Sequence, residues 1–274
     1  MARTMAWQKL EKGAEEKILA FVSKEPEVNL FISGDLLNFG IDQKHVRLHS
    51  YEKDGAIEGL LLRYMKRNYV FYTRDPAFPF AEVADLIRQD NPTLKGVSLS
   101  GKSQAVRPLL PYLSPLKLEE TMMARCNHLK WDPVCPEGAK VRVLTSKEDF
   151  QAFYALEHQI VEFASSAHGE KDQVDSLLAD KKRGAICLGV YVGDVLVSVA
   201  STTADTTLSS MLVGVCTHPD YRGKGYASLV VSSLLKNRFE KSEQFVCLFY
   251  DNPLAGRIYH ALGFEDVASY AILN

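Results

Sequence analysis

One segment, residues 215–227, constrains the fold of this chain more than any other. It reads VCTHPDYRGKGYA, an apolar strand that runs through a proline turn into a glycine-rich basic loop. Gly223 and Gly225 have no Cβ, so the backbone can turn its N–H groups towards an anion at close range. A helix is predicted to begin near Ala227, and its positive end points to the same place. The segment therefore predicts a loop that holds a diphosphate.

The residues on both sides of this loop agree with that prediction. Residues 212–217 (LVGVCT) are mostly apolar or β-branched and predict a strand, whereas residues 228–236 (SLVVSSLLK) predict a helix. Arg222 and Lys224 add positive charge to the loop. The alternative is an ordinary basic turn, which needs no ligand.

A second segment follows the first at a short distance. Residues 244–250 (QFVCLFY) predict a strand, and residues 251–264 (DNPLAGRIYHALGF) predict a helix behind it. The Asp-Asn pair at its start can cap the helix, Pro253 suits the first turn, and Gly263 ends the helix.

Together, the two segments resemble the acyl-CoA-binding motifs of the GNAT superfamily of N-acetyltransferases. Arg222, Gly225 and Ala227 match the loop pattern R/Q-x-x-G-x-G/A. The second pattern, Asn-x-x-Ala-x-x-x-Tyr-x-x-x-Gly-Phe, begins at Asn252 and includes Tyr259. A tyrosine on a helix face is alternatively a plain core residue. Two motifs in the family's order favour the functional interpretation.

The length of 274 residues allows two domains, and the two halves share a pattern. Residues 55–73 and 193–217 each read as turn, strand, turn, strand. The predicted fold class is therefore α/β (α+β), with two tandem GNAT-like domains, each a mixed, mainly antiparallel twisted sheet flanked by helices. In the first copy, residues 74–80 (RDPAFPF) contain two prolines and no glycine, so they cannot offer a row of N–H groups. We expect the first copy to be degenerate and to act as a scaffold or to shape the substrate entrance.

The boundary is predicted in the proline-containing stretch of residues 127–138. The predicted domains are residues 1–128 (degenerate GNAT-like), 129–139 (linker) and 140–274 (catalytic). The catalytic domain is expected to open with a strand at residues 140–144, a helix capped by Thr145 or Ser146, and later a hairpin centred on Gly193 and Asp194. The resemblance covers roughly residues 140–270 and looks closest to the branch that includes glycine N-acyltransferase-like proteins.

Two other patterns suggest ligands that we do not expect. Residues 96–103 (GVSLSGKS) match the Walker pattern of ATP sites, but the alternation at residues 97–100 places a strand inside the supposed loop. Residues 63–72 (RYMKRNYVFY) interleave basic and aromatic side chains, as a nucleic-acid surface does. Their basic centre lies between two apolar runs, which is typical of a hairpin tip.

Composition excludes several classes of partner. The net charge of −2 gives no field that attracts nucleic acid, and no apolar stretch approaches the ~20 residues of a membrane span. Five scattered cysteines argue against a disulfide framework, and the spacing of Cys126, His128 and Cys135 is not that of a zinc site, so no metal is expected. Without a signal peptide, the predicted location is cytoplasmic.

The resemblance implies an acyl-CoA-dependent N-acyltransferase. Acetyl-CoA, or another short acyl-CoA, is the expected co-substrate, and a primary amine on a small molecule or amino acid attacks it directly in a ternary complex. The N–H near Cys216 or Thr217 would stabilise the oxyanion, and Tyr259 would protonate the departing thiolate. The residues expected to bind the cofactor are Val215, Cys216, Thr217, Arg222, Gly223, Lys224, Gly225, Tyr226, Ala227 and Asn252.

Several alternatives stay open in the sequence. A second function is a non-catalytic acyl-CoA sensor or scaffold. A covalent route through the Cys216 thiol is less favoured, because no histidine is placed to activate it. The general base is unassigned, and the candidates are Glu157, Glu162, Asp205 and His218. The acceptor amine, the acyl chain length and a homodimeric state are not encoded in any readable pattern.

Overall fold

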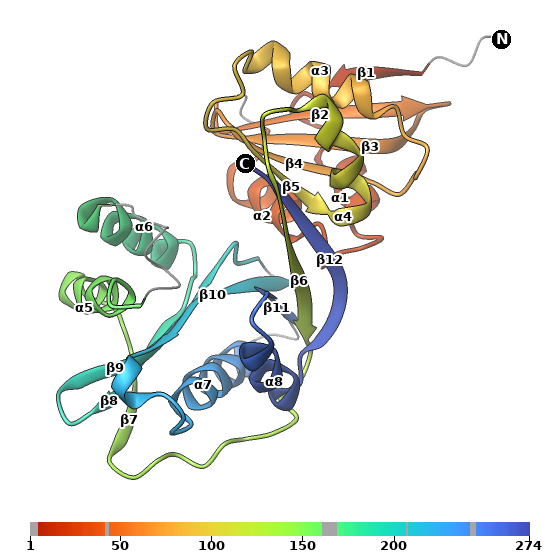
Figure 1. Ribbon diagram of the computed structural model, residues 1–274. Coiled ribbons are helices and arrows are strands. Elements are labelled where there is room, and N and C mark those ends of the chain that lie inside the picture. The colour runs from red at the N-terminus through yellow and green to blue at the C-terminus, as the bar shows by residue number, and fades with distance from the viewer. Residues whose placement is uncertain (1–4, 42–43, 161–168, 207, 242–244) are drawn as a thin grey trace. The chain divides into compact units, whose positions relative to one another are not determined.

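The computed structural model of the protein describes residues 5–41, 44–160, 169–206, 208–241 and 245–274 (Figure 1). The chain forms two compact units. The N-terminal unit contains Met1–Met123 together with Val267–Asn274, and the C-terminal unit contains Ala124–Asp266. Among the described residues, no helix has the length and apolar character that crossing a membrane requires.

The N-terminal unit is a mixed sheet with helices on its faces. Its strands are ordered β1-β2-β3-β4-β5-β12, and neighbours are antiparallel except for the parallel pair β4–β5. Its elements are β1 (Met5–Lys9), α1 (Glu15–Val22), α2 (Leu30–Phe39), β2 (Val46–Lys53), β3 (Ala56–Tyr64), β4 (Asn68–Thr73), α3 (Phe80–Asp90), β5 (Ser98–Lys102), α4 (Ser103–Val106), the 3-10 helix η1 (Arg107–Tyr112) and β6 (Leu118–Cys126).

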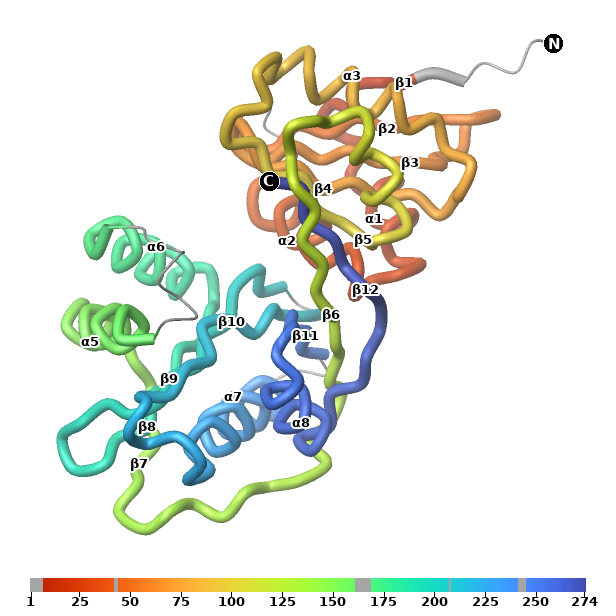
Figure 2. The backbone as a smooth tube through the Cα atoms, viewed as in Figure 1, coloured from red at the N-terminus to blue at the C-terminus, as the bar shows by residue number. Residues whose placement is uncertain are grey.

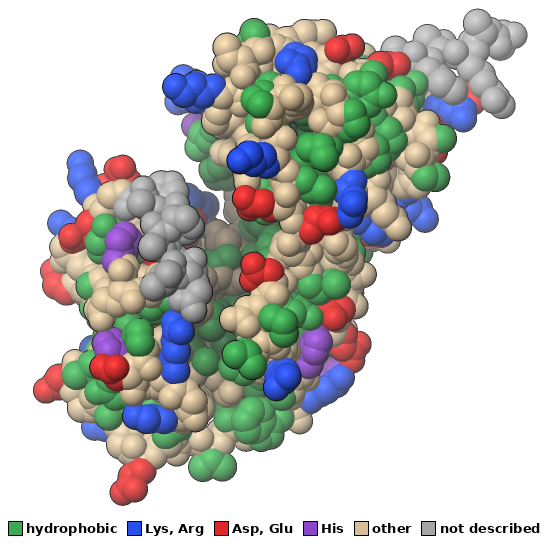
Figure 3. All heavy atoms as spheres, viewed as in Figure 1, with side chains coloured by type: hydrophobic (Ala, Val, Ile, Leu, Met, Phe, Trp, Pro, Cys, Tyr) green, Lys and Arg blue, Asp and Glu red, His purple; other side chains and the backbone are tan. Residues whose placement is uncertain are grey.

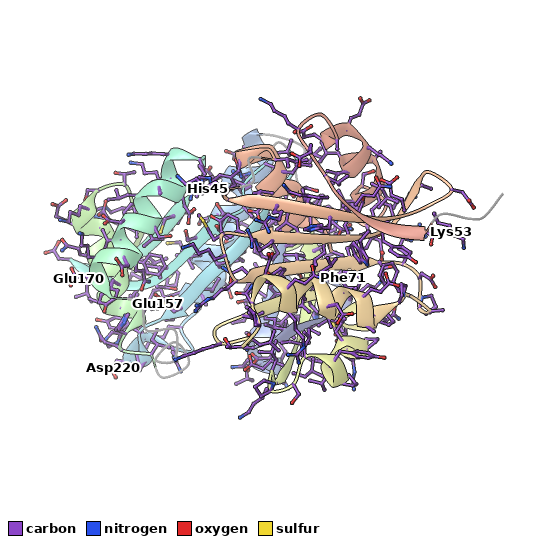
Figure 4. The ribbon with its side chains drawn as sticks, turned by 90° about the horizontal axis from the view of Figure 1, so that it is seen from above. His45, Lys53, Phe71, Glu157, Glu170 and Asp220 are labelled. Atoms are coloured by element: carbon purple, nitrogen blue, oxygen red, sulfur yellow. The ribbon has the colours of Figure 1, made fainter. Side chains whose placement is uncertain are left out.

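An aromatic cluster fills the core of the N-terminal unit on the side of α3. Phe71, which Figure 4 labels on β4, is fully buried and lies with its ring centroid 5.4 Å from that of Phe78. Phe78 presses so closely on β3 that a Cβ at Gly59 would lie 2.4 Å from its ring. A glycine is therefore required there, and the loop before α3 is anchored in the core.

The C-terminal unit has the strand order β7-β8-β9-β10-β11, again antiparallel except for its last pair, β10–β11. Its elements are β7 (Ala139–Val143), α5 (Lys147–Glu157), α6 (Glu170–Lys182), β8 (Cys187–Val192), β9 (Val195–Thr203), β10 (Ser209–Thr217), the 3-10 helix η3 (Pro219–Tyr221), α7 (Tyr226–Lys241), β11 (Phe245–Tyr250) and α8 (Pro253–Leu262). The last strand, β12 (Glu265–Leu273), begins in this unit and lies in the N-terminal unit from Val267 on.

Helices cover both faces of this sheet, with α7 and α8 on one side and α5 and α6 on the other (Figure 1). The alternation along β8 explains why both faces are apolar. Leu188 and Val190 pack in the core under α7, whereas Cys187 and Tyr191 pack in the core under α5.

The local signals of the sequence are confirmed in this unit. Ser146 caps α5, and its capping box is completed by Asp149. Val192 pairs with Val195 across the two-residue turn at Gly193 and Asp194. In the N-terminal unit, the expected hairpin tip lies between β3 and β4, as their bounds show.

The two units repeat one order of elements. Strand, two helices, three antiparallel strands, helix, parallel strand and helix follow one another from β1 to α4 and again from β7 to α8. In each unit the parallel pair is short: residues Asn68–Val70 pair with Ser98–Ser100, and Ser209–Met211 pair with Phe245–Cys247. The predicted tandem arrangement of two similar folds is therefore present.

From Val267 on, the last strand of the sequence lies in the first unit. The prediction instead assigned all of residues 140–274 to the catalytic domain. Tyr270 to Leu273 pair antiparallel with β5, and Asn274 exchanges two backbone hydrogen bonds with Lys117. Figure 2 shows the blue end of the chain lying in the unit that contains the red and yellow segments. The pairing is non-local, and nothing in residues 267–274 identifies their partner strand.

In the described part of the first unit, the segment after β4 does not form a phosphate-binding loop. After β4, the N–H of Asp75 donates to Thr73 Oγ1, that of Ala77 to Asp75 Oδ1, and that of Phe80 to the Phe78 carbonyl. These N–H groups donate to other groups of the protein and are not available to a phosphate, which agrees with a degenerate copy.

The Walker-like residues 96–103 are not a loop either, because β5 (Ser98–Lys102) occupies their centre. Lys102 Nζ lies 2.6 Å from Glu25 Oε1, and Tyr72 Oη donates to the other oxygen of this carboxylate at 3.0 Å. The lysine therefore serves an ion pair inside the N-terminal unit. On the face drawn in Figure 3, Lys and Arg side chains lie among Asp and Glu in both units.

Candidate functional site

The candidate site lies where β10 and β11 part. Their parallel pairing covers Ser209–Met211 and Phe245–Cys247, and among the described residues it extends no further, although β10 continues to Thr217 and β11 to Tyr250. The inner edge of β10 beyond Met211 is therefore available to an extended ligand.

A bulge bends β10 at the same place. The register with β9 shifts between Val213 and Cys216, and Gly214 has φ +62°. A Cβ on Gly214 would lie 2.8 Å from Phe153 Cζ on α5, so both the backbone conformation and the space demand glycine. A glycine inside an apolar strand is the signal by which the sequence could have revealed this bulge.

Replacing Gly214 with Ala is expected to destabilise the protein by about 1–3 kcal/mol, because a left-handed backbone and a close contact are both imposed on the new methyl group. Urea unfolding followed by circular dichroism measures the change. Gly193→Ala is the matched control, since Gly193 has φ +58° but open space around it. Equal losses in the two variants would show that the contact with Phe153 contributes nothing.

The glycine loop offers a row of backbone donors. Gly223 has φ +74° and Gly225 has φ +84°, conformations that side chains disfavour, and open space surrounds both. In the described part of the chain, the N–H groups of residues 223–228 make no hydrogen bond with protein. These donors and the first turn of the 16-residue helix α7 form one anion-binding surface.

The loop is held in shape by its own side chains. Arg222 Nε donates to the Thr217 carbonyl at 3.2 Å, and Lys224 Nζ donates to the Asp220 carbonyl at 3.1 Å. Lys224 also lies over the Tyr221 ring. Both charged side chains are exposed, so their positive charge reaches solvent beside the free donors.

Ser198 on β9 anchors the end of β10, and sequence reasoning missed it. Its hydroxyl donates to the Cys216 carbonyl at 3.0 Å and lies 2.8 Å from Thr217 Oγ1. The Cys216 carbonyl accepts from Ser198 and the Thr217 carbonyl accepts from Arg222 Nε, so both carbonyls already have a partner within the protein.

The second motif lies on α8. Asn252 is exposed, and its side-chain oxygen caps the helix by accepting the N–H of Leu254 at 2.9 Å. Gly263 ends the helix with φ +116°, as expected. Ala227 and the buried Tyr226 begin α7 on the same face of the sheet as α8.

Tyr259 is 8% exposed, and its ring packs edge-on against Tyr250 and Phe264. Among the described residues its hydroxyl has no hydrogen-bond partner, yet the oxygen is not sealed from solvent. Burial raises the pKa of Tyr259 to about 12, so the phenol keeps its proton at neutral pH. It is thus a proton donor with no acceptor of its own.

Cys216 lies on the opposite face, in the core under α5. Burial raises the pKa of its thiol strongly, which disfavours the thiolate that a covalent route requires. All five cysteines of the chain are free thiols. Among the described residues, no group of three or more His, Cys, Asp or Glu side chains could hold a metal ion.

The candidate bases differ in their surroundings. Glu157, labelled on Figure 4 at the end of α5, is half-buried, its charge acts on Cys216, and it accepts a hydrogen bond from Gln173. Asp205 instead pairs with the buried Arg238 at 3.1 Å. His218 Nδ1 accepts the N–H of Asp220 in η3. Glu162 lies outside the described residues.

Comparison with known proteins identifies the class to which this fold belongs. The family model described as FR47-like protein matches residues 187–272, which include both motifs. A GCN5-related N-acetyltransferase from Sphaerobacter thermophilus is similar with a TM-score of 0.70 and 12% identity, over 98% of this chain and 94% of that one. No curated protein matches the sequence.

Two further solved structures agree. A tandem GNAT protein from the clavulanic acid biosynthesis pathway, solved without AcCoA, gives a TM-score of 0.60 at 14% identity and covers 98% of both chains. A GCN5-related N-acetyltransferase from Kribbella flavida gives 0.60 at 20% identity, over 79% of this chain and 86% of that one. The chain thus has the tandem fold of the GCN5-related N-acetyltransferases, and its residues 187–272 carry the FR47-like pattern. The predicted GNAT resemblance and fold class are confirmed.

Proposed function

We propose that the C-terminal unit is an acyl-CoA-dependent N-acyltransferase that moves an acetyl or other short acyl group to a primary amine. The observation that carries this proposal is the row of N–H groups at residues 223–228, which have no hydrogen-bond partner among the described residues and follow β10, the strand whose pairing with β11 stops at Met211. A diphosphate needs such donors at one end, and an extended pantetheine arm needs an unpaired strand edge at the other.

The residues present fit this ligand. Gly223, Gly225 and the start of α7 would hold the pyrophosphate, with Arg222 and Lys224 supplying charge. Val215 on the inner edge of β10 would pair with the pantetheine amides. The side-chain amide group of Asn252, whose oxygen caps α8, would contact the same arm.

Direct attack by the amine is the chemistry that these residues support. The backbone N–H near Cys216 or Thr217 would stabilise the oxyanion that forms as the amine adds to the thioester. Tyr259 would give its proton to the departing thiolate. Glu157 is the candidate base whose charge reaches Cys216. The alternative is a non-catalytic acyl-CoA sensor. A sensor would give no role to the Tyr259 hydroxyl, which has no hydrogen-bond partner among the described residues.

Calorimetric titration of acetyl-CoA and of free CoA into the full chain tests the ligand, and a screen of pooled amines for thiol release then tests the reaction. Binding of both ligands with thiol release in a pool supports the enzyme and gives the acceptor class. Binding without release from any pool would favour the sensor. Absence of binding would end the proposal.

Replacing Tyr259 with Phe is expected to lower kcat on the order of 100-fold while acetyl-CoA binding is retained, because only the proton donor is removed. Since a raised pKa keeps the phenol protonated, wild-type kcat should show no alkaline loss from this group until the pH approaches about 12. Thiol-release kinetics across pH measure both effects. Tyr112→Phe, on an exposed tyrosine of the N-terminal unit, is the control. Unchanged kcat in Tyr259→Phe would remove the acid from the mechanism.

A further inference from the structure

Three polar side chains beside Tyr259 form a cluster that the proposed transfer does not use. Tyr250 ends β11, His260 lies on α8, and Asp266 lies at the start of β12. Tyr250 Oη donates to Asp266 Oδ1 at 2.8 Å, and His260 Nε2 lies 3.0 Å from the same oxygen. The two donors are themselves 3.2 Å apart. Two groups from β11 and α8 thus meet at one carboxylate oxygen of β12.

The cluster holds one end of the Tyr250 side chain, and the ring at its other end contacts α8 and Tyr259. A Cβ on Gly256 would lie 2.5 Å from Tyr250 Cε2, so the ring rests directly on the helix backbone one turn before Tyr259. Its centroid lies 6.0 Å from that of Tyr259, with the planes at 63°. Any side chain at position 256 larger than hydrogen would force the Tyr250 ring to shift.

Tyr250 also lies on the part of β11 that no longer pairs with β10. The pairing of β11 with β10 ends at Cys247, so Tyr250 stands at the open part of the site. Tyr259 has no hydrogen bond in the described part of the chain to fix its hydroxyl, which leaves ring packing by Tyr250 and Phe264 to set its orientation.

We infer that Tyr250, anchored by Asp266 and His260, is a positioning residue that fixes the orientation of the Tyr259 hydroxyl. The inference rests on the proposed role of Tyr259 as the proton donor. The pKa of Asp266 lies below its ordinary value: burial raises this pKa, but the hydrogen bonds from His260 and Tyr250 lower it by more. The anchor is therefore an ionised carboxylate that accepts from both donors.

The positioning itself is tested without any acceptor amine. The full chain is labelled with carbon-13 at the tyrosine ζ carbons, and the Tyr259 signal is assigned by its loss in Tyr259→Phe. The signal is expected to shift or broaden in Tyr250→Phe and in Asp266→Ala. It should stay unchanged in Glu265→Gln, because Glu265 is an exposed neighbour that pairs with Lys130 instead. A Tyr259 signal that is the same in all variants would overturn the inference.

Kinetics then separate positioning from general stability. Asp266→Ala is expected to lower kcat about tenfold with the KM for acetyl-CoA changed less than about twofold, as a misplaced acid would. In the Tyr259→Phe background, the same change should cost nothing further, and His260→Gln, which keeps an N–H donor, should retain most activity. Additive losses would contradict action through Tyr259. If Tyr259→Phe alone leaves kcat unchanged, the proposed acid role fails, while the carbon-13 signals still report whether Tyr250 orients the ring.

Discussion

Acetyl-CoA is expected to stop binding when Arg222 is replaced by Glu and Gly225 by Asp together. The first change reverses the charge beside the loop. The second forces a side chain onto a backbone with φ +84° and puts a carboxylate among the free N–H groups. The Kd measured by calorimetry should rise by at least about 100-fold, since charge-assisted hydrogen bonds to the diphosphate are replaced by repulsion.

The chain provides a closely matched control at the end of α6. Arg183→Glu with Gly184→Asp makes the same exchanges at a glycine that also has positive φ, +101°, and open space around it. This variant should bind acetyl-CoA with wild-type affinity. Loss of binding in the control, or its retention in the loop variant, would show that residues 222–225 are not the diphosphate site.

The N-terminal unit is expected to lose about 2–5 kcal/mol of stability when Leu273 is replaced by Ala, the range for a fully buried leucine. Leu273 is 0% exposed, pairs with Leu99 of β5 and belongs to the core that contains Phe71. Hydrogen exchange read peptide by peptide suits this test, because two units need not unfold in one step. Faster exchange is expected in β5 and in the strands beside it.

The control lies on the same strand. Val267 is 41% exposed, so Val267→Ala should change stability by no more than about 0.5 kcal/mol. A stronger form of the test removes Val267–Asn274 altogether, which deletes the strand on one edge of β5 and leaves β4 on the other. Unchanged protection of the β5 residues that pair with β12, Leu99–Lys102, would contradict the assignment of the strand to this unit.

Local features of the fold could be predicted from the sequence because neighbours in the chain determine them. The capping box at Ser146, the two-residue turn at Gly193 and the helix end at Gly263 each depend on a few adjacent residues. The partner of β12 could not be predicted in this way. Strand pairing depends on surfaces far apart in the chain, and alternation gives a strand its two faces without naming its neighbour.

The same limit applies to the site. The glycine loop and the Asn252–Tyr259 helix are contiguous motifs, so their resemblance to the acyl-CoA-binding motifs of N-acetyltransferases is visible in the sequence. Ser198, which anchors the end of β10, comes from another strand, and Tyr250 meets Asp266 only because β11 and β12 bring them together. Close packing between distant residues can leave a trace in the sequence, a glycine that makes room for a ring, as Gly214 does for Phe153 and Gly256 for Tyr250.

The position of β12 also sets the order in which the protein can mature on the ribosome. Domains usually fold as they emerge, the N-terminal one first. Here the sheet of the first unit gains the strand beside β5 only after residues 267–273 have been synthesised. Until then β5 is an unpaired edge, the kind of surface that recruits other chains and chaperones. The unit that is translated first is therefore the one that is finished last.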